Sequence, residues 1–365
     1  MTSRAAIFWG PGRPFTVEEV ELREPRMGEV VVRMVAAGIC GTDLHSVRGE
    51  FRRPTPMVLG HEGAGVVESV GDGVERVAVG DEVVLSWAPS CGECFDCRRA
   101  RPAACSRLHA AIAAGTLVDG TTGITLRGEL VYRGTATGCL AERVVVSERV
   151  ALPTGGAIPL EQAALLGCAA LTGVGAVLFA ARVEEGESVL VVGAGAVGQF
   201  AVQGARIAGA GEIVAVDPVT ARREQSLALG ATHAFSPSEI EAALPEILPD
   251  GADVGFDAVG DPRTTAVTLE LTRPGGRAVL VGLPAAGARL DLDPALFVRR
   301  EKWLTGTMYG SEDPAVALPI LLEHVRAGRL LLEPLLGPRF ALEDVNEAVA
   351  ASLAGSPGRV LVRLS

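Results

Sequence analysis

Four of the seven cysteines lie within fifteen residues, in the stretch CGECFDCRRARPAAC at positions 91–105. Thiols at this density are typical of disulfides, of an iron–sulfur cluster or of a metal site. The spacing is C-x2-C-x2-C-x7-C, and its long last gap, followed by Ser106, departs from the common bacterial iron–sulfur pattern. The four residues are Cys91, Cys94, Cys97 and Cys105.

Two further cysteines and one histidine lie on three separated segments, each beside a glycine. They are Cys40 in GICGTDLH, His61 in GHE and Cys168 in LLGCAALTG. Catalytic zinc takes three protein ligands and keeps one position for water or substrate. We therefore expect Cys40, His61 and Cys168 to converge as an open metal site, and interpret Cys139 as a small buried or pocket-lining thiol.

A glycine-rich turn in VLVVGAGAVGQFAVQGARIAG has the G-x-G-x-x-G spacing at Gly193, Gly195 and Gly198. An apolar strand precedes it, a helical stretch follows, and the next strand ends at Asp217, which is the context a dinucleotide site requires. The glycines would allow the tight turn, the approach of a pyrophosphate and close helix packing, in that order. Asp217 would accept bonds from ribose hydroxyls and repel a 2′-phosphate, which favours NAD over NADP. The alternative is a glycine turn in an unliganded sheet.

The elements that must position these residues fall into three regions. Up to about residue 150, short strands separated by Gly and Pro predict an antiparallel, barrel-like domain. From about 170 to 308, six apolar strands alternate with helical stretches and predict a doubly wound parallel sheet. The last residues predict one helix and one strand that pack back on the first domain.

Composition excludes some classes of protein. The 365 residues are 48% hydrophobic and 21% charged, which is typical of a globular chain. A net charge of −11 argues against a nucleic-acid-binding protein. The start, MTSRAAIFWGPGRPF, does not resemble a signal peptide, and the uncharged stretch 163–181 is mostly Ala and Gly, so we expect a buried helix, no membrane span and a cytoplasmic location. Reduced thiols there disfavour disulfides.

In order, the motifs GICGTDLH, GHEGAGVV, GDEVV, the clustered cysteines and GAGAVG resemble the zinc-dependent medium-chain alcohol dehydrogenases. The stretch GTLVDGTTGITLRGELVYRGTATG resembles the longer loop of the liver-type branch. The resemblance implies a GroES-like catalytic domain at 1–169 and 309–365 and a Rossmann NAD-binding domain at 170–308. It also implies NAD and two zinc ions per chain, one structural on the clustered cysteines and one catalytic on Cys40, His61 and Cys168.

The resemblance further assigns roles around the catalytic metal. Thr42 would take the substrate proton and His45 would release it to solvent, although a surface histidine is the alternative for His45. Asp43 would orient His61 through its second ring nitrogen. Glu62 would either bind the metal transiently or make a structural hydrogen bond.

Other matched positions concern the cofactor and the substrate. Thr172 and Val197 would line the nicotinamide, Arg222 the adenosine ribose and Arg359 the pyrophosphate. Gly41 stands where the liver-type branch often has a cation. Trp87, Leu283 and Met308 would wall an apolar substrate pocket.

The expected function is the NAD-linked interconversion of an alkyl, benzylic or terpenoid alcohol and its aldehyde or ketone. Two alternatives stay open: a thiol-dependent formaldehyde dehydrogenase and a non-catalytic NAD-binding protein. A homodimer is expected, through edge pairing near residues 302–309, with a tetramer as the second choice.

Overall fold

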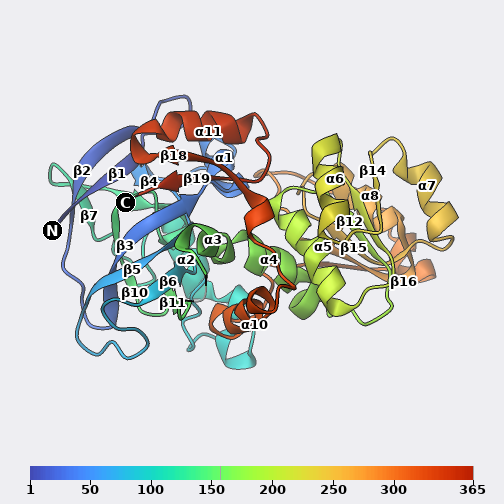
Figure 1. Ribbon diagram of the computed structural model, residues 1–365, viewed down its shortest axis with the longest axis horizontal. Helices are drawn as coiled ribbons and strands as arrows, with labels where there is room; N and C mark the ends of the chain where they lie inside the picture. The colour runs from blue at the N-terminus through green and yellow to red at the C-terminus, as the bar shows by residue number, and fades with distance from the viewer. Residues whose placement is uncertain (157, 365) are drawn as a thin grey trace. The chain divides into compact units, whose positions relative to one another are not determined.

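The computed structural model describes residues 1–156 and 158–364, which form two compact units. Unit 1 comprises residues 1–169, 313–326 and 332–365, and unit 2 comprises residues 170–312 and 327–331. Figure 1 labels most of the helices and strands of both units.

Unit 1 is built on two predominantly antiparallel sheets. The first has the order β8-β7-β2-β1-β4-β9, and the second has the order β11-β6-β5-β3-β19-β18, with β10 also paired to β3. The strands of the first sheet are β1 (Thr2–Phe8), β2 (Thr16–Leu22), β4 (Met57–Val58), β7 (Ile124–Leu126), β8 (Glu129–Leu130) and β9 (Tyr132–Arg133). Those of the second are β3 (Glu29–Gly38), β5 (Glu62–Val70), β6 (Glu82–Leu85), β10 (Arg143–Ser147), β11 (Ala151–Pro153), β18 (Leu336–Ala341) and β19 (Arg359–Arg363).

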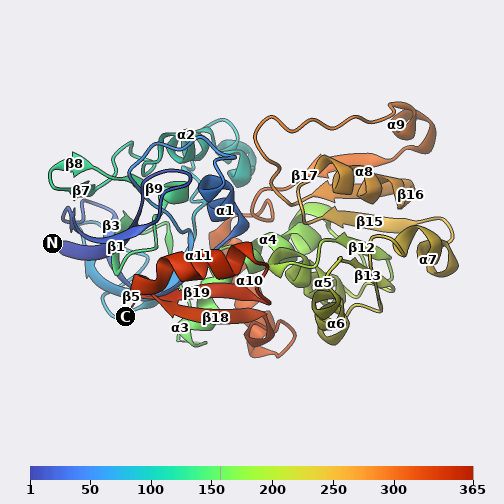
Figure 2. The same cartoon turned by 90° about the horizontal axis from the view of Figure 1, so that it is seen from above.

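Short helices complete unit 1. They are α1 (Gly41–Val47), α2 (Ser106–Ala114), α3 (Leu160–Ala164), α10 (Pro314–Arg326) and α11 (Val345–Leu353). The C-terminal strand β19 pairs antiparallel with β3, and α11 runs alongside β18 and β19 (Figure 2). The end of the chain therefore adds two strands to the second sheet of unit 1 and a helix beside them.

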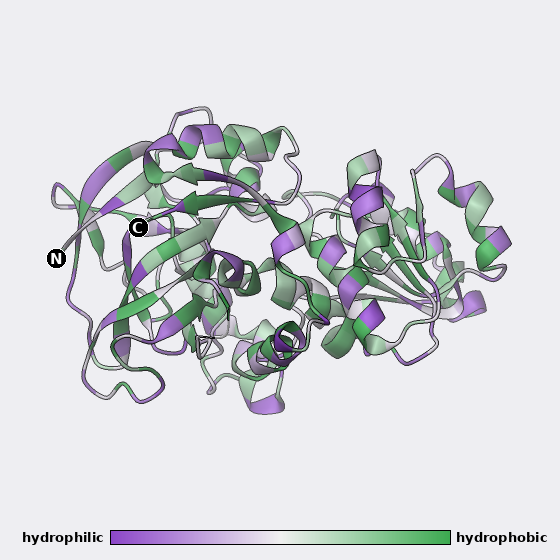
Figure 3. Ribbon diagram, viewed as in Figure 1, coloured by the Kyte–Doolittle hydropathy of each residue, from purple (hydrophilic) through white to green (hydrophobic). Residues whose placement is uncertain are grey.

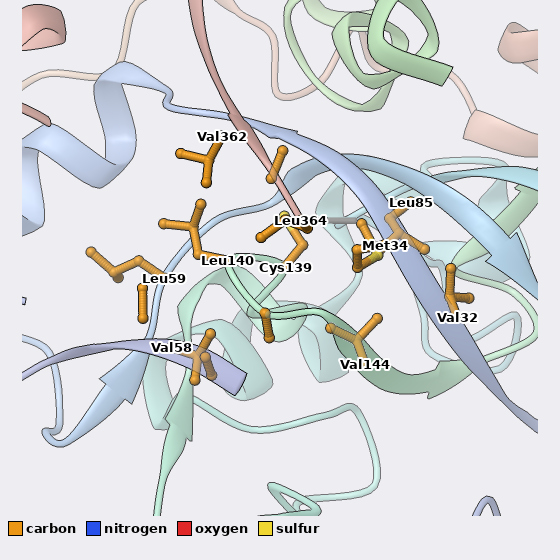
Figure 4. Close-up of a cluster of buried hydrophobic side chains, with 14 of the residues drawn as sticks. Val32, Met34, Val58, Leu59, Leu85, Cys139, Leu140, Val144, Val362 and Leu364 are labelled. Carbon is orange, nitrogen blue, oxygen red and sulfur yellow. The ribbon is translucent and has the colours of Figure 1, made fainter. Parts of the chain in front are cut away.

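One apolar core holds unit 1 together. It takes residues from β1 to β7 and from the C-terminal segment, and Cys139 is one of its members. Figure 4 shows Cys139 among aliphatic side chains such as Met34, Leu140 and Leu364. A fully buried thiol in such surroundings behaves as a small hydrophobic group.

Unit 2 contains the predicted parallel sheet. All its strand pairs are parallel, in the order β14-β13-β12-β15-β16-β17. The strands are β12 (Val189–Val192), β13 (Ile213–Val216), β14 (His233–Phe235), β15 (Ala252–Asp257), β16 (Thr272–Leu280) and β17 (Trp303–Gly306). The helices are α4 (Ala169–Gly175, whose first residue belongs to unit 1), α5 (Ala196–Ala208), α6 (Thr220–Leu229), α7 (Ile240–Ile247), α8 (Pro262–Glu270) and α9 (Ala295–Arg300).

The central strands β12 and β13 are buried along their whole length, and Figure 3 shows them mostly in the hydrophobic colour. Parallel strands are usually covered on both faces, which explains their continuous apolar runs. The predicted fold class, an antiparallel β part with a doubly wound six-stranded parallel sheet, is confirmed.

The run AERVVVSERVALP, at the end of the region in which short strands are predicted, forms two strands, β10 and β11, which pair with β3 and β6 respectively. The chain turns between them because Val150 N–H donates to the Ser147 carbonyl at 2.8 Å. No Gly or Pro marks this turn, so its sequence carries no turn signal.

No single helix among the described residues has the length and apolar composition needed to span a membrane. By those two criteria alone, the bent pair Leu160–Gly167 and Ala169–Ala181 would qualify.

Candidate functional site

Unit 1 brings together the three residues of the predicted open metal site. Cys40 is the residue before α1, His61 precedes β5, and Cys168 precedes α4. Their ligand atoms all lie within 4.8 Å of one another, and all three side chains are buried. Three segments that are distant in sequence therefore converge on one point.

Asp43 positions two of these residues. Its Oδ2 accepts a hydrogen bond from the Cys40 backbone N–H at 3.0 Å, and its Oδ1 accepts one from Gly60 N–H at 3.1 Å. The same Oδ1 lies 3.4 Å from His61 Nδ1, which leaves Nε2 as the nitrogen for a ligand. Burial opposes the charged imidazole, but Asp43 and then Cys40 raise the pKa of His61 well above its usual value.

The two sulfurs share the cluster's negative charge. A hydrogen bond from Cys168 lowers the pKa of the Cys40 thiol well below its ordinary value and raises that of Cys168. Two buried sulfurs and one imidazole, with a thiolate already favoured, form the donor set that a divalent cation such as zinc prefers. The residues present therefore fit a catalytic zinc.

A buried ion pair lies against this cluster. Arg359 Nε is 2.9 Å from Glu62 Oε1, Glu62 is 0% exposed, and its Oε2 accepts from Ala169 N–H at 3.3 Å. Arg359 also donates to the Ile39 carbonyl at 2.9 Å. Burial raises the pKa of Glu62 to about 7, although Arg359 opposes that rise. Glu62 thus makes a structural hydrogen bond, with Ala169 N–H, which is one of the two roles that the sequence analysis gave it.

The residues of the predicted proton path lie on α1. Thr42 is on its first turn, and its carbonyl accepts from Ser46 Oγ at 3.3 Å. His45 Nδ1 contacts Glu50 Oε2, its ring lies 4.8 Å from the Phe51 ring, and its side chain is 20% exposed. His45 therefore has the access to water that proton release requires.

The clustered cysteines also converge. Their four sulfurs lie within 4.8 Å of one another, and Cys91 Sγ is 3.8 Å from Cys97 Sγ. That separation excludes a disulfide, and it equals the edge of about 3.8 Å expected for a tetrahedron with zinc–sulfur bonds of about 2.3 Å. Backbone N–H groups of Cys91 and Cys94 point at Cys105 Sγ and Cys91 Sγ, at 3.4 and 3.3 Å. The geometry fits a closed zinc site.

The glycine-rich turn of unit 2 has the backbone shape expected for a tight turn, for the approach of a pyrophosphate and for close helix packing. Gly193 has φ +92°, and a Cβ on Gly198 would lie 1.8 Å from the Gly193 carbonyl oxygen, so only glycine fits there. A Cβ on Gly195 would meet nothing within 4 Å, which leaves room for a ligand at the start of α5. Asp217 directly follows β13 and is buried; its carboxylate accepts from Ala194 and Val219 N–H, and Arg222 lies 3.7 Å away.

The remaining predicted residues are distributed over both units. Trp87 meets His61 edge-on, with ring centroids 6.1 Å apart. In unit 2, Thr172 and Val197 lie on α4 and α5, which pack closely because a Cβ on Gly173 would lie 2.3 Å from the Val197 carbonyl. Leu283 is exposed after β16, and Met308 follows β17.

Sequence reasoning missed two features. The direct contact of Arg359 with Glu62 is one, and the second is Arg133, a completely buried arginine in the long loop. Neither has a local signal, since an arginine in a sequence is usually exposed.

Comparison with known proteins agrees with this geometry. Residues 26–156 match the alcohol dehydrogenase GroES-like domain, and residues 196–323 match the zinc-binding dehydrogenase domain. Alcohol dehydrogenase 6 of Peromyscus maniculatus is 35% identical over 95% of this chain and 93% of its own length. S-(hydroxymethyl)glutathione dehydrogenase of Escherichia coli is 33% identical over 100% of both chains.

A solved structure is similar over its whole length. Benzyl alcohol dehydrogenase from Acinetobacter calcoaceticus superposes with a TM-score of 0.94, is 30% identical and is covered over 100% of both chains. The expected GroES-like and Rossmann-type parts are both confirmed by these matches. The chain therefore belongs to the zinc-dependent medium-chain alcohol dehydrogenase family and is an oxidoreductase of that type.

Proposed function

We propose that the protein is an NAD-linked enzyme that oxidises an alcohol to its aldehyde or ketone, or reduces the carbonyl, with one catalytic and one structural zinc per chain. The observation that carries this proposal is the buried convergence of Cys40, His61 and Cys168. A three-ligand site leaves one coordination position for substrate, which a purely structural site does not need.

Cys40, His61 and Cys168 would hold the catalytic zinc, and the four clustered cysteines would hold the structural one. When bound, zinc polarises the substrate oxygen as a Lewis acid and the nicotinamide exchanges hydride with the substrate carbon. Asp43 would fix the imidazole of His61 so that Nε2 faces the metal. Glu62 and Arg359 would fill the buried space behind the ligands and exclude water from it.

Thr42 would accept the hydroxyl proton of the substrate, and His45 would release it to solvent. This route is supported by the partial exposure of His45 and by Glu50, whose carboxylate contacts Nδ1. Imidazole is suited to such a transfer because its two ring nitrogens can accept and donate a proton in turn.

Unit 2 would bind NAD at the glycine-rich turn, with the free N–H groups at the start of α5 facing the pyrophosphate. Asp217 keeps lone pairs for ribose hydroxyls after its two backbone bonds, because a carboxylate can accept about four. Arg222 would assist at the ribose and Arg359 at the pyrophosphate, and Thr172 and Val197 would face the nicotinamide. We accordingly propose residues 1–169 and 309–365 as the catalytic domain and 170–308 as the NAD-binding domain.

For the substrate, we propose an apolar alcohol of the alkyl, benzylic or terpenoid classes, with Trp87, Leu283 and Met308 as pocket residues. The likeness to a benzyl alcohol dehydrogenase supports the benzylic class. The second candidate is a thiol-dependent formaldehyde dehydrogenase, because S-(hydroxymethyl)glutathione dehydrogenases are among its relatives. Formaldehyde oxidation that requires added glutathione would favour this candidate over the first.

The central experiment compares two cysteine variants. Cys40→Ala should lose about one zinc per chain and the alcohol-dependent formation of NADH. Cys139→Ala, which removes a buried thiol outside the cluster, should keep both. Zinc is measured by elemental analysis and NADH by absorbance over a panel of alcohols. Unchanged turnover in Cys40→Ala would contradict the proposal and favour a non-catalytic role for the site.

We further propose a homodimer formed through β17, with a tetramer as the alternative. β17 is an edge strand of its sheet, and Trp303 on it is 69% exposed. An exposed apolar edge is prone to pair with a second copy. Trp303→Lys should shift the mass measured by light scattering toward the monomer, and an unchanged mass would refute this interface. We also propose a reducing, cytoplasmic location, where thiol ligands of zinc stay reduced.

A further inference from the structure

The long loop of unit 1 surrounds a fully buried guanidinium. Arg133 is 0% exposed; its Nε donates to the Thr122 carbonyl and its Nη1 donates to the Thr137 carbonyl at 2.7 Å. Within the described part of the chain, its Nη2 has no hydrogen-bond partner and no carboxylate forms an ion pair with it. A buried charge normally has a counter-charge, because desolvation of a lone ion is unfavourable by several kcal/mol.

A second unpartnered nitrogen faces the same point. Arg23 is bound at both terminal nitrogens by Glu29, with Nη2 to Oε1 at 2.7 Å, but its buried Nε has no partner among the residues the structure describes. A Cβ built on Gly123 would lie 3.1 Å from Arg23 Nε and 3.5 Å from Arg133 Nη2. The two unpartnered nitrogens therefore lie near one another, on the same side of Gly123.

The local charge leaves a surplus of one positive charge. Glu29 neutralises Arg23, while Arg133 has only carbonyl partners. Asp119 lies 3.8 Å from Arg23 and 3.7 Å from Arg26, but these outer groups are largely exposed and screened by water. Burial lowers the pKa of Arg133 to about 9, so the group still carries its charge at neutral pH.

An open pocket adjoins this space. Its volume is about 650 Å³, and Arg23, Thr122 and Gly123 line it together with apolar residues such as Leu22, Ile124 and Leu130. This volume is typical of pockets for small ligands. Glu21 and Arg26 also line this pocket, and a ligand whose apolar body lies in it could reach Arg23 with a negative group.

We propose that the space beside Gly123 binds one monovalent anion through Arg23 Nε and Arg133 Nη2, either as a free halide or as the carboxylate of a small apolar acid. The site is separate from the cysteine–histidine cluster and does not depend on the proposed reaction. Bound anion would link the ends of β2 and β9, because Arg23 follows β2 and Arg133 ends β9.

Two glycine variants provide a matched test. Gly123→Ala places a methyl group in the anion space, whereas Gly128→Ala places one where nothing lies within 4 Å. Both glycines have positive φ, at +66° and +83°, so alanine introduces similar backbone strain in both. Arg133→Gln is the third variant and removes the charge.

The probes are sodium bromide, sodium chloride, sodium acetate and sodium benzoate with the full chain. Bromine anomalous scattering from soaked crystals should place bromide between the two nitrogens in the wild type and in Gly128→Ala, but not in Gly123→Ala or Arg133→Gln. In thermal unfolding, the preferred anion should raise Tm by about 2–3 °C at ten times its midpoint concentration. That rise should vanish in the same two variants.

The four salts also distinguish a halide ligand from a carboxylate ligand. A rise with chloride and bromide identifies a halide site, and a rise with benzoate alone identifies a carboxylate site. The proposal is overturned if the crystals show only an ordered water, without anomalous signal, between the two nitrogens and if none of the four salts raises Tm. An anion-induced Tm rise that is equal in wild type and Gly123→Ala, or that needs hundreds of millimolar salt, also overturns it.

Discussion

The ion pair between Glu62 and Arg359 offers the sharpest test of how unit 1 is held together behind its metal site. Replacing Arg359 with Met leaves the Glu62 carboxylate at 0% exposure with Ala169 N–H as its remaining partner. At 2.9 Å and an effective dielectric constant of about 20, the lost attraction is about 6 kcal/mol. Broken buried pairs destabilise proteins by about 3–5 kcal/mol, so we expect a loss in that range.

The assay is a double-mutant cycle. Urea unfolding at pH 8 is measured for Arg359→Met, Glu62→Gln and the double variant, all at equal zinc content. Each single variant leaves one buried group unpaired, so the double variant should lose about 3 kcal/mol less than the sum of the two. Arg143→Met, which breaks the half-exposed pair with Glu68, is the control and should lose less than about 1 kcal/mol.

The pH dependence follows from the raised pKa of Glu62. A carboxyl whose folded pKa is raised from 4.5 to about 7 stabilises the folded state at low pH, and that contribution is lost as pH rises through about 7. Without Arg359 the pKa of Glu62 rises further, so Glu62 stays protonated, and the deficit of Arg359→Met should be about 1.4 kcal/mol larger at pH 8 than at pH 5, the free energy of one pKa unit. Additive losses within about 0.5 kcal/mol, or a deficit that does not change with pH, would refute the reasoning.

Three other predictions concern the cofactor and the structural zinc. Asp217→Gly should raise the ratio of NADP to NAD use, measured as kcat/KM, by about tenfold; an unchanged ratio would contradict the ribose role. Gly41→Arg should slow NADH release in stopped-flow measurements by about tenfold, since a Cβ at this position meets no atom within 4 Å and a charged contact with the cofactor is gained. In metal-free protein, backbone N–H groups, that of Cys97 first, lower the pKa of Cys94 to about 6, whereas burial and neighbouring thiols raise that of Cys97 to about 12. Iodoacetamide at pH 7 should therefore label Cys94 before Cys97 by mass spectrometry, and added zinc should protect both; equal labelling would argue against this geometry.

The parallel sheet was predictable because its strands are buried on both faces and appear as continuous apolar runs, as in β12 and β13. The antiparallel sheets of unit 1 were predicted only in outline. The boundary between β10 and β11 has no signal in the sequence, because Glu148 and Arg149 form their turn without Gly or Pro. Two-residue strands such as β4 and β9 exist only through their partners and have no periodicity of their own.

In the candidate site, too, some residues are placed by the local sequence and others by pairing between distant segments. Cys40, Thr42, Asp43 and His45 lie within six residues, and the start of α1 places them because Asp43, at its third position, accepts from the Cys40 backbone N–H. That bond is part of a helix cap, so the geometry follows from the local sequence. Arg359 instead reaches Glu62 only because β19 pairs with β3, and no local pattern encodes a pairing between the two ends of a chain. The same limit applies to Arg133, whose burial depends on how the long loop folds over β4 and β9, which is why its unpartnered nitrogen could be found only in the structure.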